Sequence, residues 1–280
     1  MKIAYSSNAY TKNSLSQAID DIARIGFDGL EILCDRPHWF CPEVADQEAE
    51  RIAEQLIERG LKVSNLNANT ADGYFIGRKA ENAFEPALSS LDKEARKWRI
   101  DYSCRAIELG ALVNANAVCV TSGLPKGDHN RQAQLKHFVD SMKAICDFAE
   151  RFQMPVGIEY EPELLVEFGE QVLEVIEQVG SPLLGTNLDV GHSFLNGEDP
   201  SKIIPQFKGR IWNMHFEDIK DNTHFHLPLG QGELPFASYI EALKAIEYDR
   251  FLTVELYTYP DSPDTVGQIS HDYLRALIGE

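Results

Sequence analysis

The feature that most constrains the fold is an alternation of short, apolar, β-rich runs with longer segments of helical period. Each run has the length of one strand, and most are too apolar to leave either face in water. This alternation predicts parallel strands joined by helical crossovers, because parallel strands cannot be joined by a tight turn. The eight runs are residues 2–6, 29–33, 62–66, 117–121, 156–160, 185–189, 211–216 and 251–256.

The segments between the runs carry helix signals. Ser14 can cap the segment LSQAIDDIARIG, which places Leu15, Ile19 and Ile22 on one face and ends at Gly26. Further helices are predicted over residues 48–59, 102–109, 133–152, 169–179 and 237–246. Eight strands alternating with helices in 280 residues predict a (β/α)8 TIM barrel, with one domain over residues 1–280.

Two connections are too long to be plain turns. Residues 67–100 mix aromatic, basic and small side chains, which favours a lid over the barrel mouth or, equally, a surface excursion. Residues 218–236 contain Pro and Gly that break every periodicity, so an irregular loop is predicted there. Because these connections follow the third and seventh strands, we expect both at the carboxyl-terminal face, where barrel active sites lie.

Metal-ligand side chains lie at the ends of four consecutive predicted strands. These residues are Glu159, Asp189, His215 and Glu255. Each one alone is compatible with a solvated strand end or a packing role, but carboxylates buried together would repel one another without a cation. The four residues therefore predict a divalent metal site. Three carboxylates and one imidazole favour Mn²⁺, Mg²⁺ or Co²⁺ and also allow Zn²⁺.

At these residues the sequence resembles the xylose isomerase-like TIM-barrel superfamily, which includes ketose 3-epimerases, sugar isomerases, hydroxypyruvate isomerase and endonuclease IV. The similarity runs through IARIGFDGLEI, GIEYEP, NLDVGH, MHFED, LGQGELPF and VELY, and so spans nearly the whole chain. It implies that Glu159, Asp189, His215 and Glu255 ligate the metal. It also implies that Glu159 and Glu255 move substrate protons through an enediolate-like intermediate.

Four further residues are expected near the substrate. His192 matches the family's Asp-x-x-His, where the His contacts substrate oxygens or, in some branches, a second metal. Glu161 either binds substrate or faces solvent. His224 and His226 precede LGQG, a pattern that resembles an additional zinc site of endonuclease IV, but the third and fourth strands lack the histidines of that enzyme. We therefore interpret both as loop residues over the substrate, with metal ligation left open.

A second departure from the family is Glu217, in the segment His215-Phe-Glu217-Asp218, where many relatives read His-x-Lys-Asp. A carboxylate thus stands where those relatives carry a cation. An anionic substrate group that relied on that Lys would lose its partner in this chain.

The expected activity is a metal-dependent isomerase or epimerase acting on a small polyhydroxy carbonyl compound, such as a sugar, sugar phosphate or sugar acid. A lyase of the dehydroshikimate dehydratase type uses similar chemistry and stays open. An endonuclease IV-like phosphodiesterase is disfavoured by the net charge of −18, which repels a phosphate backbone, so no nucleic-acid partner is expected. A ligand-binding barrel without catalysis is the fourth alternative.

The cysteines and the hydropathy pattern bear on the compartment. The five cysteines are odd in number and never form Cys-x-x-Cys, which is typical of reduced thiols. No apolar run reaches the length of a signal peptide or a membrane span, so we expect a cytoplasmic protein without a membrane partner. The sequence leaves the oligomeric state open, and a homo-oligomer is among the arrangements it allows.

Overall fold

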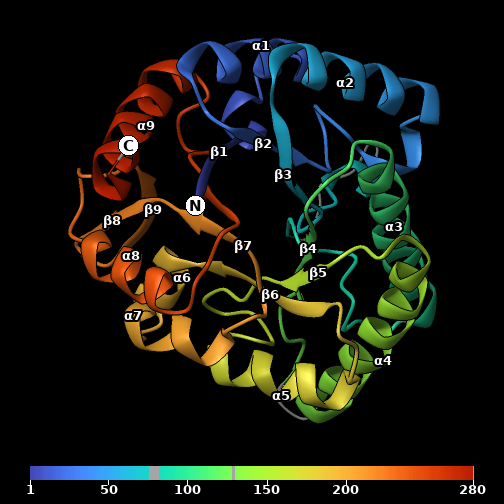
Figure 1. The fold of residues 1–280 in the computed structure, drawn as a ribbon. Coiled ribbons are helices and arrows are strands. Elements are labelled where there is room, and N and C mark those ends of the chain that lie inside the picture. Colours follow the sequence, from blue (N-terminus) through green and yellow to red (C-terminus); the bar gives the residue numbers. More distant parts are fainter. Residues whose placement is uncertain (76–81, 128–129, 280) are drawn as a thin grey trace.

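The computed structural model describes residues 1–75, 82–127 and 130–279. Parallel strands close a barrel in the order β1-β10-β7-β6-β5-β4-β3-β2, and helices surround it (Figure 1). The strands are β1 (Lys2–Ser6), β2 (Gly29–Leu33), β3 (Lys62–Asn67), β4 (Val118–Val120), β5 (Val156–Ile158), β6 (Leu184–Asp189), β7 (Ile211–Phe216) and β10 (Phe251–Val254). The predicted (β/α)8 barrel is confirmed, and every predicted strand overlaps an observed one.

Nine α-helices lie in the described part of the chain. They are α1 (Leu15–Ile25), α2 (Asp46–Arg59), α3 (Lys93–Leu112), α4 (Arg131–Ala149), α5 (Gly169–Val179), α6 (Val190–Leu195), α7 (Pro200–Ile203), α8 (Phe236–Ala245) and α9 (Pro263–Ile278). Short 3-10 helices cover η1 (Ser7–Tyr10), η2 (Cys41–Glu43), η3 (Asp72–Phe75), η5 (Glu150–Phe152) and η6 (Ile204–Phe207). None of the helices described is long and apolar enough to cross a bilayer.

Helix boundaries follow the capping residues. The Ser14 side chain accepts a hydrogen bond from the Gln17 N–H, and Gly26 ends α1 with a left-handed φ of 108°. Helix α3 is longer than the predicted 102–109, because Asp92 caps it at a point well before residue 102. The helix also continues through Gly110 instead of ending there. Helices α6, α7 and α9 were not predicted.

The connection after β3 is long, as predicted, but it ends where α3 begins at Lys93 and not near residue 100. Its first part contains the 3-10 helix η3, whose start is held by Asp35. The Asp35 carboxylate accepts hydrogen bonds from the backbone N–H groups of Asp72 and Gly73 and from the Thr70 hydroxyl. Residues 76–81 of the predicted lid lie outside the described residues.

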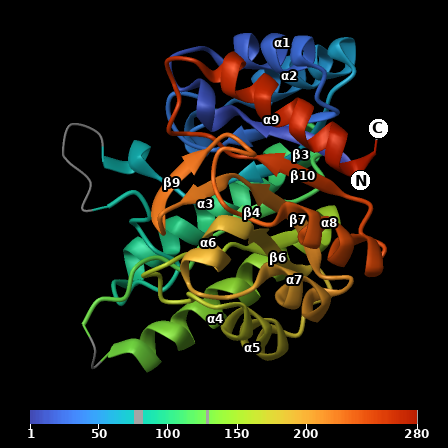
Figure 2. The same ribbon diagram turned by 90° about the vertical axis from the view of Figure 1, so that its left-hand side faces the viewer.

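The connection after β7 is not irregular throughout, so the loop prediction was wrong for its first part. Strand β8 (Asp218–Lys220) pairs antiparallel with β9 (Thr223–Leu227), because Asp221 and Asn222 adopt φ values of 53° and 50° in the turn between them. Figure 2 shows the β8–β9 hairpin at the same end of the barrel as η3 and opposite the N-terminus, as expected for the carboxyl-terminal face.

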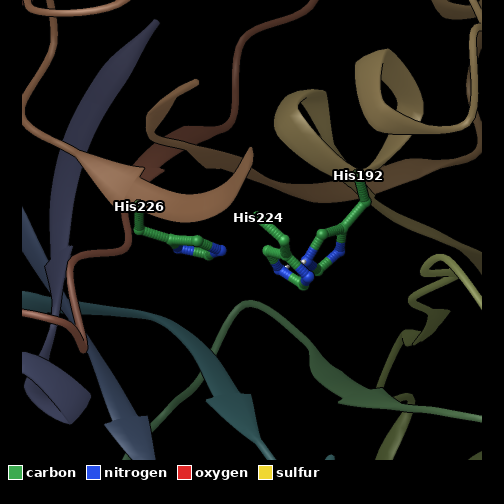
Figure 3. Close-up of side chains that lie close together, drawn as sticks. All are labelled: His192, His224 and His226. Carbon is green, nitrogen blue, oxygen red and sulfur yellow. Dashed lines mark hydrogen bonds between the residues drawn. The ribbon is translucent and has the colours of Figure 1, made fainter. Parts of the chain in front are cut away.

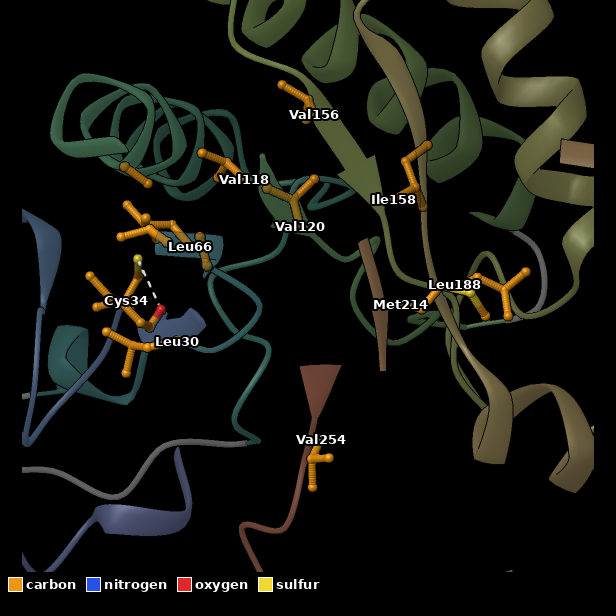
Figure 4. Close-up of a cluster of buried hydrophobic side chains, with 14 of the residues drawn as sticks. Leu30, Cys34, Leu66, Val118, Val120, Val156, Ile158, Leu188, Met214 and Val254 are labelled. Atoms are coloured by element: carbon orange, nitrogen blue, oxygen red, sulfur yellow. Dashed lines mark hydrogen bonds between the residues drawn. The ribbon is translucent and has the colours of Figure 1, made fainter. Parts of the chain in front are cut away.

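Several strands, among them β6 and β7, alternate apolar and polar side chains. The apolar set of Figure 4, which includes Leu188 and Met214, belongs to a buried cluster that also contains side chains of the surrounding helices. The polar set is linked by hydrogen bonds: Asn213 Nδ2 donates to Asn187 Oδ1 at 2.8 Å, and Thr253 Oγ1 donates to Asn213 Oδ1 at 2.8 Å. Since successive side chains point to opposite faces, the apolar residues pack against the helices and the polar residues line the interior. The inside of the barrel therefore leads into a polar site.

Candidate metal centre and active site

The four predicted metal ligands converge at the carboxyl ends of β5, β6, β7 and β10. Glu159, Asp189, His215 and Glu255 each offer one ligand atom, and these atoms all lie within 4.8 Å of one another. His215 Nδ1 lies 3.2 Å from Glu159 Oε1, 3.8 Å from Asp189 Oδ2 and 3.7 Å from Glu255 Oε2. The group is buried. Tertiary structure thus brings together the whole predicted set.

Each glutamate is held by two asparagine amides. Asn69 Nδ2 donates to Glu159 Oε2 at 2.9 Å, and Asn187 Nδ2 donates to the same oxygen. On the other side, Glu255 Oε1 accepts from Asn8 Nδ2 at 2.8 Å and from Asn67 Nδ2 at 3.2 Å. One oxygen of each carboxylate is therefore fixed by amides. The second oxygen faces His215 and remains available to a ligand.

Glu31, in the middle of β2, orients His215 from behind. Its Oε2 lies 2.7 Å from His215 Nε2, and the residue is fully buried. A carboxylate accepts the Nε2 proton, so Nδ1 is the nitrogen turned toward the other ligands. Although burial disfavours the charged imidazolium, the carboxylates Glu159, Glu255 and Glu31 raise the pKa of His215 well above its usual value.

Burial and neighbouring charges raise the pKa values of the other acids at the site. Burial, followed by the charges of Glu217 and Glu159, raises the pKa of Asp189 well above its usual range. Burial likewise raises the pKa of Glu255 well above normal and that of Glu217 to about 8. An oxygen-rich donor set of buried carboxylates that repel one another fits a divalent cation.

A cavity of about 350 Å³ opens directly above these ligands. Glu159 and Glu255 line it, together with the asparagines Asn8, Asn67 and Asn69 and with Phe84 and Tyr257. Its size and its mixture of polar and aromatic walls suit a small polar molecule. Three of the predicted substrate-binding residues, Glu161, His192 and His224, also line this cavity.

The three histidines come from two neighbouring elements (Figure 3). Asp189 Oδ1 accepts a hydrogen bond from the His192 N–H at 2.7 Å and so caps α6, which carries His192, whereas His224 and His226 lie on β9. His192 Nε2 lies 3.2 Å from His224 Nε2, and His224 is exposed. His226 is fully buried, is not among the residues that line the cavity, and places Nδ1 2.8 Å from the Glu255 carbonyl oxygen.

Several residues of the site were not predicted. Glu31 is the clearest, and its signal was a single carboxylate inside the apolar run GLEIL. The asparagines of the run SNLNANT, Asn67 and Asn69, also belong to the site, together with Asn8 and Asn187. Glu217 departs from the pattern of the relatives, but its position beside Asp189 was not predicted.

Comparisons with known proteins agree with this fold. The chain is 22% identical over 286 residues to fructoselysine 3-epimerase of Shigella flexneri, covering 100% of this chain and 99% of that protein. The structure resembles that of a D-tagatose 3-epimerase-like protein with a TM-score of 0.82, at 21% identity, covering 99% of this chain and 98% of the other. It also resembles the IOLI protein crystallised with a zinc atom, with a TM-score of 0.81, at 17% identity and the same coverage of 99% and 98%.

The family model described as xylose isomerase-like TIM barrel matches residues 19–277 of the chain. That range includes all four converging ligands and both long connections. The protein is therefore a member of the xylose isomerase-like TIM-barrel family.

Proposed function

We propose that this protein is a metal-dependent sugar isomerase or epimerase that moves a proton at a carbon next to a carbonyl group. The observation that carries the proposal is the matched pair Glu159 and Glu255, which line one cavity and each have one oxygen fixed by two asparagine amides. The relatives support the same reaction class, because the similar proteins include fructoselysine 3-epimerase. The substrate is a small polyhydroxy carbonyl compound.

Glu159, Asp189, His215 and Glu255 would hold the cation, with Mn²⁺, Mg²⁺ or Co²⁺ favoured and Zn²⁺ allowed. A divalent cation there supplies Lewis-acid polarisation of the substrate carbonyl and the adjacent hydroxyl. The zinc atom of the IOLI protein supports a metal in this fold. Glu31 keeps the Nδ1 atom of His215 turned toward the centre.

The two glutamates divide the proton transfer between them. One removes the proton from the substrate carbon, and the other returns a proton from its own side of the cavity. Return to the same carbon inverts its configuration, whereas return to the neighbouring carbon interconverts an aldose and a ketose. His192, His224 and Glu161 line the cavity and contact substrate oxygens. His226 lies outside the cavity lining, with Nδ1 2.8 Å from the Glu255 carbonyl oxygen.

The test follows solvent deuterium into the carbon skeleton by NMR. Ketohexoses and fructoselysine are incubated in D2O with the metal-loaded protein and, separately, with chelator-treated protein. Carbon-bound exchange is expected only with metal, and both Glu159→Gln and Glu255→Gln should remove it. Glu198→Gln, a half-buried carboxyl outside the cavity that accepts from the Gly169 N–H at 3.0 Å, is the control and should retain exchange.

Two results would overturn the proposal. Exchange that persists after Glu159→Gln or Glu255→Gln would exclude the paired-glutamate reaction. Products lighter than the substrate by one water would instead assign a lyase of the dehydroshikimate dehydratase type, since isomerisation and epimerisation conserve mass.

A further inference from the structure

Four asparagine side chains donate to the two proton-transferring glutamates, and they differ in what their amide oxygens contact. Asn187 Oδ1 accepts from Asn213 Nδ2 at 2.8 Å, and Asn67 Oδ1 accepts from the Asn69 N–H at 3.2 Å. In contrast, Asn8 Oδ1 and Asn69 Oδ1 have no hydrogen-bond partner among the described residues. The chain therefore uses two of the four amide oxygens and leaves the other two open.

The orientation of the Asn8 and Asn69 amides is fixed by the glutamates. A carboxylate only accepts, so each asparagine must direct its Nδ2 group at its glutamate and its Oδ1 atom elsewhere. Asn8 Nδ2 lies 2.8 Å from Glu255 Oε1. Asn69 Nδ2 lies 2.9 Å from Glu159 Oε2. The two asparagines are only 7% and 6% exposed, and a buried amide oxygen without a donor is costly, so both oxygens call for a donor from outside the chain.

The backbone holds both asparagines in place. Asn8 belongs to η1, and its N–H donates to the Ser6 side chain, which caps this helix, at 3.3 Å. Asn69 follows β3, and its carbonyl oxygen accepts from the buried Arg99 guanidinium, which also donates to the Ala68 carbonyl at 2.7 Å. Two amide oxygens on separate elements are thus held in position, one beside each glutamate.

The cavity around these oxygens is rich in acceptors. Asn8 and Asn69 both line it, and Asp72 and Glu161 add two further carboxyl groups. Its described lining residues include no Lys or Arg. A ligand that satisfies such walls must bring hydrogen-bond donors of its own, as the hydroxyl groups of a sugar do. A carboxylate or a phosphate dianion has no proton to donate.

We propose that Asn8 and Asn69 are substrate-binding residues, each of which accepts a hydrogen bond from a different hydroxyl group of the substrate. Each asparagine then connects one hydroxyl group with one proton-transferring glutamate. The pair selects a substrate that carries hydroxyl groups, and not phosphate or carboxylate groups, at these two positions. The inference rests on the proposed function and adds to it two specificity-determining residues and the substrate groups that they recognise.

The test removes hydroxyl groups from the sugar one at a time. D-Fructose, D-tagatose, D-psicose and fructoselysine are screened for metal-dependent exchange in D2O, and the monodeoxy and monodeoxyfluoro analogues of the fastest are measured as inhibitors. For the wild type, the loss of a hydroxyl group that bonds to either asparagine should raise the inhibition constant about five- to tenfold above the KM of the parent sugar. Fluorine cannot donate a hydrogen bond, so the fluoro analogue should lose as much.

Variants assign each hydroxyl group to its asparagine. Asn8→Ala should abolish the penalty at one hydroxyl position and Asn69→Ala the penalty at another, because the acceptor is already absent. Asn187→Ala is the matched contrast, since it removes a donor to Glu159 but no oxygen that lines the cavity. It should slow exchange and leave every penalty at the wild-type value. A purely structural role of Asn8 or Asn69 would give the same result as Asn187→Ala.

Each outcome decides the proposal. Penalties that stay at the wild-type values in both Asn8→Ala and Asn69→Ala would overturn it and leave the proposed function intact. Uniform inhibition constants for all analogues of the wild type would overturn it as well, and this measurement does not depend on the folding of a variant. If none of the four sugars shows metal-dependent exchange, the proposed function and this inference fail together.

Discussion

The two ends of the barrel treat their polar groups in opposite ways. At the amino-terminal end, Arg210 donates to the carbonyl oxygens of Ser181, Pro182 and Leu184 at 3.0, 3.0 and 2.9 Å. At the carboxyl-terminal end, Asn8 and Asn69 keep amide oxygens without any hydrogen-bond partner among the described residues. The first arrangement completes backbone hydrogen bonds, and the second leaves acceptors open.

One scaffold thus keeps the residues that stabilise the fold apart from those of the candidate site. Charged side chains that donate hydrogen bonds to acceptors of the same chain stabilise the fold. Arg250 is a second example at the amino-terminal end, where it donates to Asn116 Oδ1 at 2.9 Å and lies over the Trp212 ring. Acceptors that the chain leaves open are costly in the free protein and favour the binding of a ligand. Substitutions at the two ends should therefore change different measured quantities.

The largest expected effect is on turnover. Glu159→Gln should lower kcat by about 10²–10⁴-fold, because it removes a group that transfers a proton in the proposed reaction. Thermal unfolding of the metal-free protein should show no loss of stability, since a buried charge is removed. A Glu159→Gln variant that unfolds at a clearly lower temperature would contradict the assignment of this end to function.

A smaller effect is expected on metal affinity. Glu31→Gln should weaken binding of the cation by about 10- to 100-fold, because the carboxylate no longer fixes the orientation of His215. Isothermal titration of the stripped protein with Mn²⁺ measures this directly. Unchanged affinity would mean that the contact between Glu31 and His215 is structural only.

The matched change at the amino-terminal end is Arg210→Met. It replaces the guanidinium with an apolar side chain of similar length and leaves the carbonyls of Ser181, Pro182 and Leu184 without this donor, which should cost about 1–3 kcal/mol of unfolding free energy. Urea denaturation measures the loss. Metal stoichiometry and KM should not change, and a shift in either would break the proposed division between the two ends.

The smallest effect is expected at the edge of the cavity. Asp35→Asn replaces an acceptor of the Asp72 and Gly73 N–H groups, so the wall formed by Thr70 and Asp72 loses its anchor. At about 1 kcal/mol for one weakened hydrogen bond, KM should rise by about fivefold with little change in kcat. Steady-state kinetics checks this, and a fall in kcat with constant KM would place Asp35 nearer the chemistry.

Local pattern was enough to predict the barrel. Each strand is marked by an apolar run, and residues such as Ser14 and Gly26 mark helix ends through contacts within one turn. The hydropathy pattern did not predict the β8–β9 hairpin, which depends on the turn conformation of Asp221 and Asn222. Asp92 shows the same limit, because it caps α3 inside the connection 67–100, which the sequence predicted as a lid or a surface excursion.

The convergence of the four candidate metal ligands was predictable because a barrel places the ends of all its strands at one face. The partners of those ligands were not predictable in the same way. Glu31 lies 184 residues from His215 in sequence, and Asn8 lies 247 residues from Glu255. No local periodicity reports which side chain will stand opposite another after the sheet closes on itself.

The strands, most of the helices between them and the residue types at the carboxyl-terminal face therefore follow from the sequence alone, because those properties arise from local propensity and strand order. Three contacts are visible only in the folded chain: Glu31 orients His215, asparagines hold Glu159 and Glu255, and Glu217 lies beside His226. Those contacts depend on barrel closure and strand register, which place residues from distant parts of the chain within a few ångströms of one another.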